Sequence, residues 1–176
     1  MKQELESILS FGAQAVSGEK TIFDQAALRH LDRLMEGNSG YKTTPANPAV
    51  LSQELREGTA KNGQSPLAVI VCCSDSRVPP EHIFHAGIGE LFIIRNAGNL
   101  ISDFALGSVE YAVEHLETPL VVVMGHTGCG AVGTALTPAQ EKGGLAAILA
   151  EIRDAIAGES DPHQAVRKNT LHALAT

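Results

Sequence analysis

Three short apolar runs, each followed by a polar cluster, constrain the fold more than any other feature of the sequence. The runs are LAVIVC at 67–72, LFIIR at 91–95 and PLVVVMGH at 119–126. They show no alternation of polar and apolar residues, which is typical of strands buried on both faces. The segment 104–116 has apolar residues at helical spacing, namely Leu106, Val109, Ala112, Val113 and Leu116. Buried strands connected by helices predict an α/β fold with a mainly parallel sheet flanked by helices.

The N-terminal third predicts helices separated by a loop. Residues 21–37 place apolar side chains at helical intervals, and Gly37 is the expected end of that helix. Residues 38–50 are rich in Gly, Pro and Asn, which predicts a loop, and 51–58 form a second helical pattern. We therefore expect a single domain over 1–176, with an N-terminal helical arm at 1–36 and an α/β core at 64–176.

Charge and hydropathy exclude several classes of protein. The formal net charge of −7 disfavours a nucleic-acid or anionic-membrane partner, because both need clustered Lys and Arg. No apolar run approaches the ~20 residues that a membrane-spanning helix requires. Glu4 and Glu6 stand where a secretory signal would carry positive charge. We therefore expect a cytoplasmic protein that binds neither nucleic acid nor membrane.

The polar clusters at the strand ends carry metal-ligand chemistry. They read CSDSR, RNAGN and GHTGCG, and they follow the three apolar runs in order. Because ligands of parallel sheets bind beyond the carboxyl ends of the strands, we expect these clusters to lie together. Cys73, His126 and Cys129 offer two thiolates and an imidazole, with Asp75 or water as a fourth ligand. This donor set matches the tetrahedral preference of Zn²⁺.

The adjacent cysteines predict different roles for their side chains. Successive side chains of a strand point to opposite faces, so Cys72 and Cys73 do not both reach one metal unless the strand ends between them. Cys73 leaves the apolar run and is the better ligand candidate, whereas Cys72 packs as a small apolar residue. The alternative is that the cysteines are simply core residues, since free Cys is among the most buried residue types. A redox centre is disfavoured by the absence of C-x-x-C, and a dinucleotide site by the order of the glycines in GHTGCGAVG.

The segments CSDSRVPPE, GELFIIRNAGN and GHTGCGAV resemble the β-class carbonic anhydrases, and the similarity extends over roughly residues 24–170. The resemblance implies that Cys73, His126 and Cys129 hold one Zn²⁺ per subunit. It further implies reversible hydration of CO₂ to bicarbonate and a proton, by attack of zinc-bound hydroxide. Three protein ligands leave a position for water, whose pKa the metal lowers towards ~7.

The resemblance also assigns roles around the metal. Asp75 and Arg77 correspond to a pair in which the arginine either holds the aspartate off the zinc, in open members, or releases it to become the fourth ligand, in closed ones. We expect the open, plant-type arrangement. Five residues are implied to contact the substrate: Gln64, Phe92, Ala97, Tyr111 and Gly130. From the residues alone, Gln64 is equally well an ordinary loop residue and Tyr111 a core residue.

One departure from the family, one expected assembly and two alternative functions complete the expectations. Members of the family usually continue to an additional edge strand, and because no segment up to Thr176 has its pattern, we expect this sheet to lack it. The resemblance implies a homodimer in which the N-terminal helices pack on the partner subunit, whereas larger oligomers are less secure without that strand. The alternative functions are hydrolysis of CS₂ or carbonyl sulfide at the same zinc site, and a catalytically weakened, truncated zinc protein.

Overall fold

The computed structural model describes residues 25–44, 46–47, 51–138 and 140–176. Helices and strands alternate along most of this part of the chain. They are α2 (Gln25–Thr43), α3 (Gln53–Asn62), β1 (Ala68–Cys73), α4 (Pro80–Ile83), β2 (Leu91–Asn96), α5 (Asp103–His115), β3 (Val121–Met124), α6 (Gly130–Ala135), α7 (Gly144–Ala155) and α8 (Pro162–Ala175).

The strands form the predicted parallel sheet. Among the described residues it has three strands in the order β2-β1-β3, so the first strand in the sequence lies in the centre. Val69 pairs with Phe92 on one side and with Val121 on the other. Every residue of β1 is buried, as its unbroken apolar run predicted. The expectation of an α/β fold with flanking helices is confirmed.

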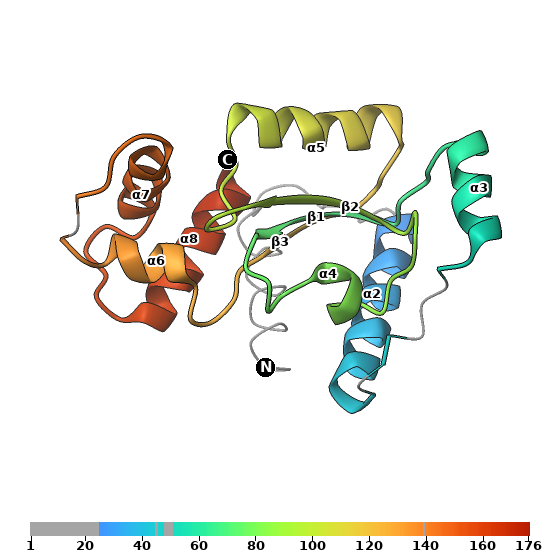
Figure 1. Cartoon of the computed structure of the whole chain (residues 1–176), viewed down its shortest axis with the longest axis horizontal. Helices are drawn as coiled ribbons and strands as arrows, with labels where there is room; N and C mark the ends of the chain where they lie inside the picture. Colours follow the sequence, from blue (N-terminus) through green and yellow to red (C-terminus); the bar gives the residue numbers. More distant parts are fainter. Residues whose placement is uncertain (1–24, 45, 48–50, 139) are drawn as a thin grey trace.

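Helices cover both faces of the sheet and gather beyond one end of it (Figure 1). Helix α5 lies over one face, with Ala112 packed among Val69, Val71 and Val123. Helices α2 and α4 cover the other face, where Leu34 and Phe84 pack against alternate residues of β1. Helices α6, α7 and α8 form a separate hydrophobic cluster that includes Cys73 and Cys129. The carboxyl end of β1 is therefore enclosed by the last three helices.

The predicted end of the first helix at Gly37 is wrong, because α2 continues to Thr43 and takes up the first part of the expected loop. Gly37 instead allows a close approach: a Cβ atom there would lie 1.8 Å from the carbonyl oxygen of Phe84. Two neighbours on α2 fix this contact, since Arg33 donates to the same carbonyl at 3.3 Å and Asn38 to that of Ile83 at 3.3 Å. Gly37 therefore allows α2 to pack closely against Phe84 and does not end the helix. The predicted start of this helix at residue 21 lies outside the described residues.

The buried side of α5 is narrower than its sequence predicted. Ala105 and Ala112 are buried, and Val109 and Leu116 are partly buried against the sheet. Leu106 and Val113 remain 38% and 43% exposed, so their assignment to the buried face is wrong. A helix resting on a flat sheet covers only one stripe of its own surface, and these two residues lie at the margin of that stripe.

No helix in the described part of the chain combines the length and the apolar character needed to cross a bilayer.

Candidate metal and active site

Three potential metal ligands meet at the carboxyl end of the sheet. Cys73 is the last residue of β1, His126 follows β3, and Cys129 stands immediately before α6. Their ligand atoms all lie within 4.8 Å of one another, and the two Sγ atoms are 3.9 Å apart. In the described part of the chain, this is the only group of three or more His, Cys, Asp or Glu residues with such spacing. The strand ends thus bring together the three side chains that the sequence predicted.

The two adjacent cysteines point to different sides of the sheet. Cys72 packs with Leu34 and Phe84 under β1, whereas Cys73 belongs to the cluster around Cys129. Burial raises the pKa of the Cys72 thiol to about 11, so this thiol stays protonated at neutral pH. Cys72 is therefore a core residue, as predicted, and Cys73 faces the site.

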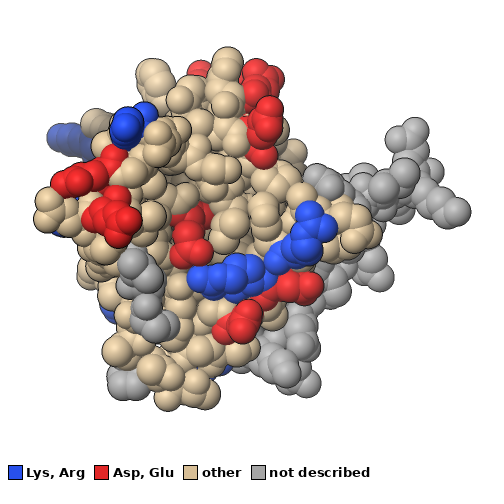
Figure 2. Space-filling model, turned by 90° about the vertical axis from the view of Figure 1, so that its right-hand side faces the viewer, with Lys and Arg blue, Asp and Glu red and all other residues tan. Residues whose placement is uncertain are grey.

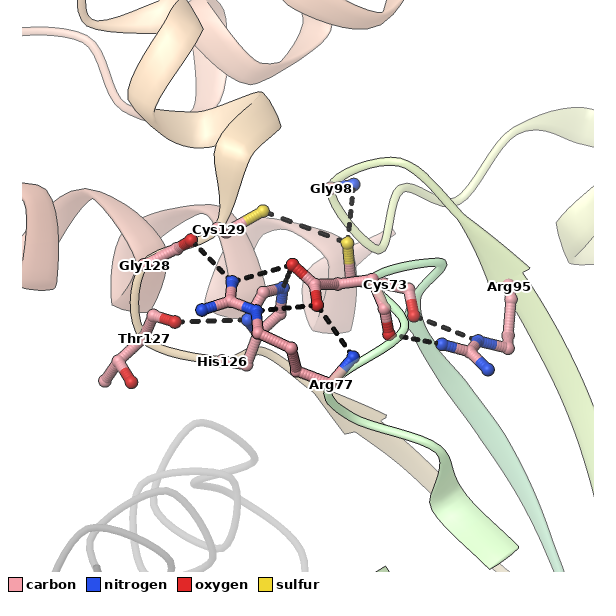
Figure 3. Close-up of polar contacts among 9 residues, drawn as sticks. Cys73, Arg77, Arg95, Gly98, His126, Thr127, Gly128 and Cys129 are labelled. Carbon is pink, nitrogen blue, oxygen red and sulfur yellow. Dashed lines mark hydrogen bonds and ion pairs between the residues drawn. The ribbon is translucent and has the colours of Figure 1, made fainter.

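The donor set fits a soft divalent cation. His126 Nδ1 lies 3.1 Å from the carbonyl oxygen of Thr127 and so carries the proton in a neutral ring (Figure 3). The other nitrogen, Nε2, is buried without a hydrogen-bond partner, which leaves a lone pair directed into the site. Burial raises the pKa of Cys129, against the opposing effect of the Val132 and Ala131 backbone N–H groups. A bound cation would satisfy the buried imidazole nitrogen by accepting its lone pair. It would also offset the effect of burial on the thiols, because it favours their thiolate form.

One further backbone donor points at Cys73. The N–H of Gly98 lies 3.4 Å from the Sγ atom of Cys73 (Figure 3). Gly98 has φ +81, and a Cβ there would lie 2.7 Å from the side chain of Ile152, so both its conformation and its surroundings favour glycine. Asn169 of α8 donates to the Gly98 carbonyl at 2.7 Å and is itself buried. The last helix thereby holds the loop that supplies a hydrogen bond to the sulfur.

Asp75 and Arg77 form a bidentate pair beside the ligands. Arg77 donates from Nε to Asp75 Oδ1 at 2.9 Å and from its terminal nitrogen to Oδ2 at 2.7 Å (Figure 3). These hydrogen bonds hold the pKa of Asp75 well below its usual range. Asp75 Oδ2 lies 3.9 Å from His126 Nε2, and Asp75 is not part of the three-ligand group. This is the pairing expected of an open site; the coordination around bound metal stays a prediction.

Arg95 is a site residue that the sequence motifs did not predict. Its Nε donates to the Cys73 carbonyl at 3.0 Å and its terminal nitrogen to the Asp75 carbonyl at 2.7 Å (Figure 3). It therefore fixes the backbone that carries one ligand and the carboxylate. The available signal was an arginine closing an otherwise apolar strand, within the RNAGN cluster.

Comparison with known proteins agrees with this geometry. The sequence model of the family described as "Carbonic anhydrase" matches residues 68–175, which contain all three candidate ligands. The chain belongs to the carbonic anhydrase family. Carbonic anhydrase 2 of Mycobacterium tuberculosis, strains CDC 1551 and H37Rv, is 49% identical over 104 residues, covering 58% of this chain and 49% of the relative. The chain thus spans about half the length of these curated relatives.

Solved structures identify the β class of carbonic anhydrases. The β-carbonic anhydrase CcaA is 31% identical, with a TM-score of 0.59 over 83% of this chain and 78% of that one. A Coccomyxa β-carbonic anhydrase in complex with acetazolamide is 25% identical, with a TM-score of 0.61 over 85% of this chain and 69% of that one. The resemblance inferred from the sequence motifs is confirmed at the level of family and fold.

The expected substrate contacts of this carbonic anhydrase chain divide between the two ends of the sheet. Ala97 follows β2 and Gly130 begins α6, so both lie on the side of the ligands. Gln64 precedes β1, and Phe92 pairs with the second residue of that strand. Tyr111 packs beside Phe92, with ring centroids 6.2 Å apart, and is 49% exposed, so it is not a core residue.

Gln64, Phe92 and Tyr111 are therefore far from the ligands of their own chain. Ala68 and Cys73, at the two ends of β1, are separated by about 16 Å at a rise of about 3.3 Å per residue. Gln64 and Tyr111 instead line a surface cavity with Gly63 and Gly89, next to the amino ends of the strands. A single copy of the chain does not bring these three residues to its own metal ligands.

Proposed function

We propose that this chain catalyses the reversible hydration of CO₂ to bicarbonate and a proton, with zinc held by Cys73, His126 and Cys129. The observation that carries the proposal is the convergence of two buried thiols and an imidazole nitrogen without a hydrogen-bond partner, beside a fixed carboxylate. Zinc held by these three ligands would supply a water molecule whose pKa is lowered to about 7. Membership of the carbonic anhydrase family supports the same reaction.

The protein groups around the metal have separable tasks. The Asp75 carboxylate is ionised and held by Arg77, so it is available to accept a hydrogen bond from the attacking water. Arg77 also donates to the Gly128 carbonyl at 2.9 Å, which connects the loop after β1 to the loop that carries His126 and Cys129. Ala97 follows the carboxyl end of β2, and Gly130 begins α6 beyond the carboxyl end of β3. In this proposal the Gly130 backbone N–H would contact substrate oxygens and the Ala97 methyl group would contact CO₂. Nothing in this geometry favours CS₂ or carbonyl sulfide as the substrate.

Two measurements on the purified chain test the reaction. Metal analysis after zinc loading and dialysis is expected to give one zinc per chain. Stopped-flow CO₂ hydration is expected to exceed the buffer rate and to disappear in Cys73→Ala together with the metal. Stoichiometric zinc without turnover in the wild type would support the alternative of a catalytically weakened zinc protein.

We also propose a homodimer in which Gln64, Phe92 and Tyr111 of one copy complete the site of the other. Support comes from their position at the opposite end of the sheet and from the exposure of Tyr111. Mixing tests it: a His126→Ala chain lacks a metal ligand but supplies Tyr111, and a Tyr111→Ala chain supplies an intact metal site. Co-refolded mixtures are expected to regain activity that neither variant shows alone. The absence of any gain, with mixed dimers shown by native mass spectrometry, would contradict the shared site.

The position of the chain in the cell stays a prediction, namely the cytoplasm.

A further inference from the structure

A surface cavity of about 490 Å³ lies at the end of the sheet remote from the metal ligands. Its walls come from α3, from the turns before β1 and β2, and from the exposed side of α5. The polar part of the lining includes Arg56, Gln64 and Tyr111, and the turns contribute Gly63, Gly89 and Ile88. The cavity thus combines one cation, one amide and one phenol.

Arg56 gives this cavity its charge. No acidic side chain belongs to the described residues that line it. Glu57, the neighbour of Arg56 on α3, accepts a hydrogen bond from Gln53 at 2.6 Å instead. Among the described residues, Arg56 has no side-chain hydrogen bond or ion pair, so its guanidinium donors are available to a ligand. Figure 2 views the molecule from the side of α3, where basic side chains lie among acidic ones rather than forming one broad patch.

A guanidinium in this setting recognises a small oxyanion. Its planar pair of N–H donors matches the two oxygens of a carboxylate-like group, and such charge-assisted hydrogen bonds are the stronger ones. Gln64 and Tyr111 add neutral donors on the same cavity. The chain as a whole carries a net charge of −7, so an anion is otherwise repelled and needs a local cation.

We propose that Arg56 is a bicarbonate-binding residue, which captures the anion in the cavity that it shares with Gln64 and Tyr111. The proposal rests on the proposed function, because bicarbonate is the only anionic partner of that reaction. In the proposed homodimer, Gln64, Phe92 and Tyr111 of one copy contact the substrate at the metal site of the other copy. Arg56 would add a positive charge to this set of contacts. Neutral CO₂ gains little from that charge, so the effect falls on the anion.

Chemical protection of Arg56 tests the binding without relying on turnover. The zinc-loaded chain is treated with phenylglyoxal, which modifies arginine, and the modified peptides are quantified by mass spectrometry. Arg29 on α2 is exposed and serves as the internal reference for the rate of the reagent. Relative to Arg29, modification of Arg56 is expected to slow about tenfold when bicarbonate is present at about ten times its dissociation constant. Chloride at the same ionic strength is expected to give no protection.

The second measurement is the inhibition constant of bicarbonate in variants of α3. Arg56→Gln is expected to raise the inhibition constant of bicarbonate in CO₂ hydration about tenfold, the usual effect of losing a charged hydrogen bond. Lys61→Gln is the matched control, because it removes the same charge from α3 at a residue that does not line the cavity. Arg56→Lys is expected to recover part of the loss.

The outcomes separate the two proposals. CO₂ hydration without protection of Arg56, or equal effects of Arg56→Gln and Lys61→Gln, overturns the role of Arg56. Protection of Arg56 by bicarbonate in a zinc-loaded chain that does not hydrate CO₂ supports the anion site and contradicts the proposed function.

Discussion

The Arg77 guanidinium donates hydrogen bonds to both carboxylate oxygens of Asp75, and the Arg77 backbone N–H donates to Oδ1 at 2.9 Å. The same guanidinium also donates to the Gly128 carbonyl across the site. One side chain therefore fixes the carboxylate and connects the two loops that carry the metal ligands. Because both loops are irregular, this connection determines how the carboxylate lies relative to the ligands.

Removing this connection is expected to lower activity more than metal content. Arg77→Ala should reduce kcat/KM for CO₂ about 10- to 100-fold, the usual effect of losing a residue that orients a metal site. Arg77→Lys should recover only part of the rate, because an ammonium does not form the bidentate pair. Stopped-flow kinetics and metal analysis on the same samples measure both quantities. A wild-type rate in Arg77→Ala, with Arg29→Ala as the control, would contradict this role.

The two adjacent cysteines should respond very differently to substitution. Cys73→Ala is expected to lose zinc, since two of three ligands hold a metal far less tightly. Cys72→Ala removes one buried atom on the other side of the sheet, which costs roughly 1 kcal/mol of stability and leaves the metal in place. Zinc per chain after dialysis separates the two. Loss of zinc from both variants at equal thermal stability would mean that the two cysteines are not distinct.

The metal ligands and the sheet were predictable from the sequence because short contiguous segments, the apolar runs and the polar clusters that follow them, indicate both. Ligands of parallel α/β sheets bind beyond the carboxyl ends of the strands, and Cys73, His126 and Cys129 stand at or shortly after such ends. The contribution of Arg95 depends on contacts with the carbonyl groups of Cys73, at the end of β1, and of Asp75, in the loop that follows, and no periodicity in the sequence indicates such contacts. The role of Gly37 was also not predictable, because its closest neighbour, Phe84, lies in the connection between α4 and β2, far away in the sequence.

A pH-dependent stability effect is expected at Glu159, in the connection between α7 and α8. Its Oε1 accepts from the backbone N–H groups of Asp161 at 3.1 Å and Ser160 at 2.9 Å, and Lys168 pairs with Oε2 at 3.3 Å. These contacts, the backbone ones first, lower the pKa of Glu159 in the folded chain. A lowered pKa stabilises the fold above the unfolded value of about 4.3, and this stabilisation is lost as the pH falls through the folded value.

Glu159→Gln should therefore be less stable than the wild type at pH 7. The difference should shrink as the pH falls below the unfolded value of about 4.3, and it should vanish only below the lowered folded value, where the wild-type carboxyl is also protonated. Urea unfolding at pH 7, 5 and 3.5 follows the difference. The matched control is Glu151→Gln, because Glu151 lies on α7 and, within the described part of the chain, pairs only with the exposed His172. A difference that persists unchanged at pH 3.5 would show that charge on Glu159 is not the cause.

Because α2 approaches Phe84 closely, replacing two helical glycines by alanine should have opposite effects on stability. Gly37→Ala places a methyl group 1.8 Å from the Phe84 carbonyl oxygen, so α2 must move and its hydrogen bonds from Arg33 and Asn38 must lengthen. Overpacking of this kind costs about 1–3 kcal/mol or more. Gly58→Ala on α3 meets nothing within 4 Å and should stabilise the chain by about 0.5–1 kcal/mol through helix propensity. Chemical unfolding of both variants measures the difference, and a neutral Gly37→Ala would mean that α2 is not held against α4 in solution.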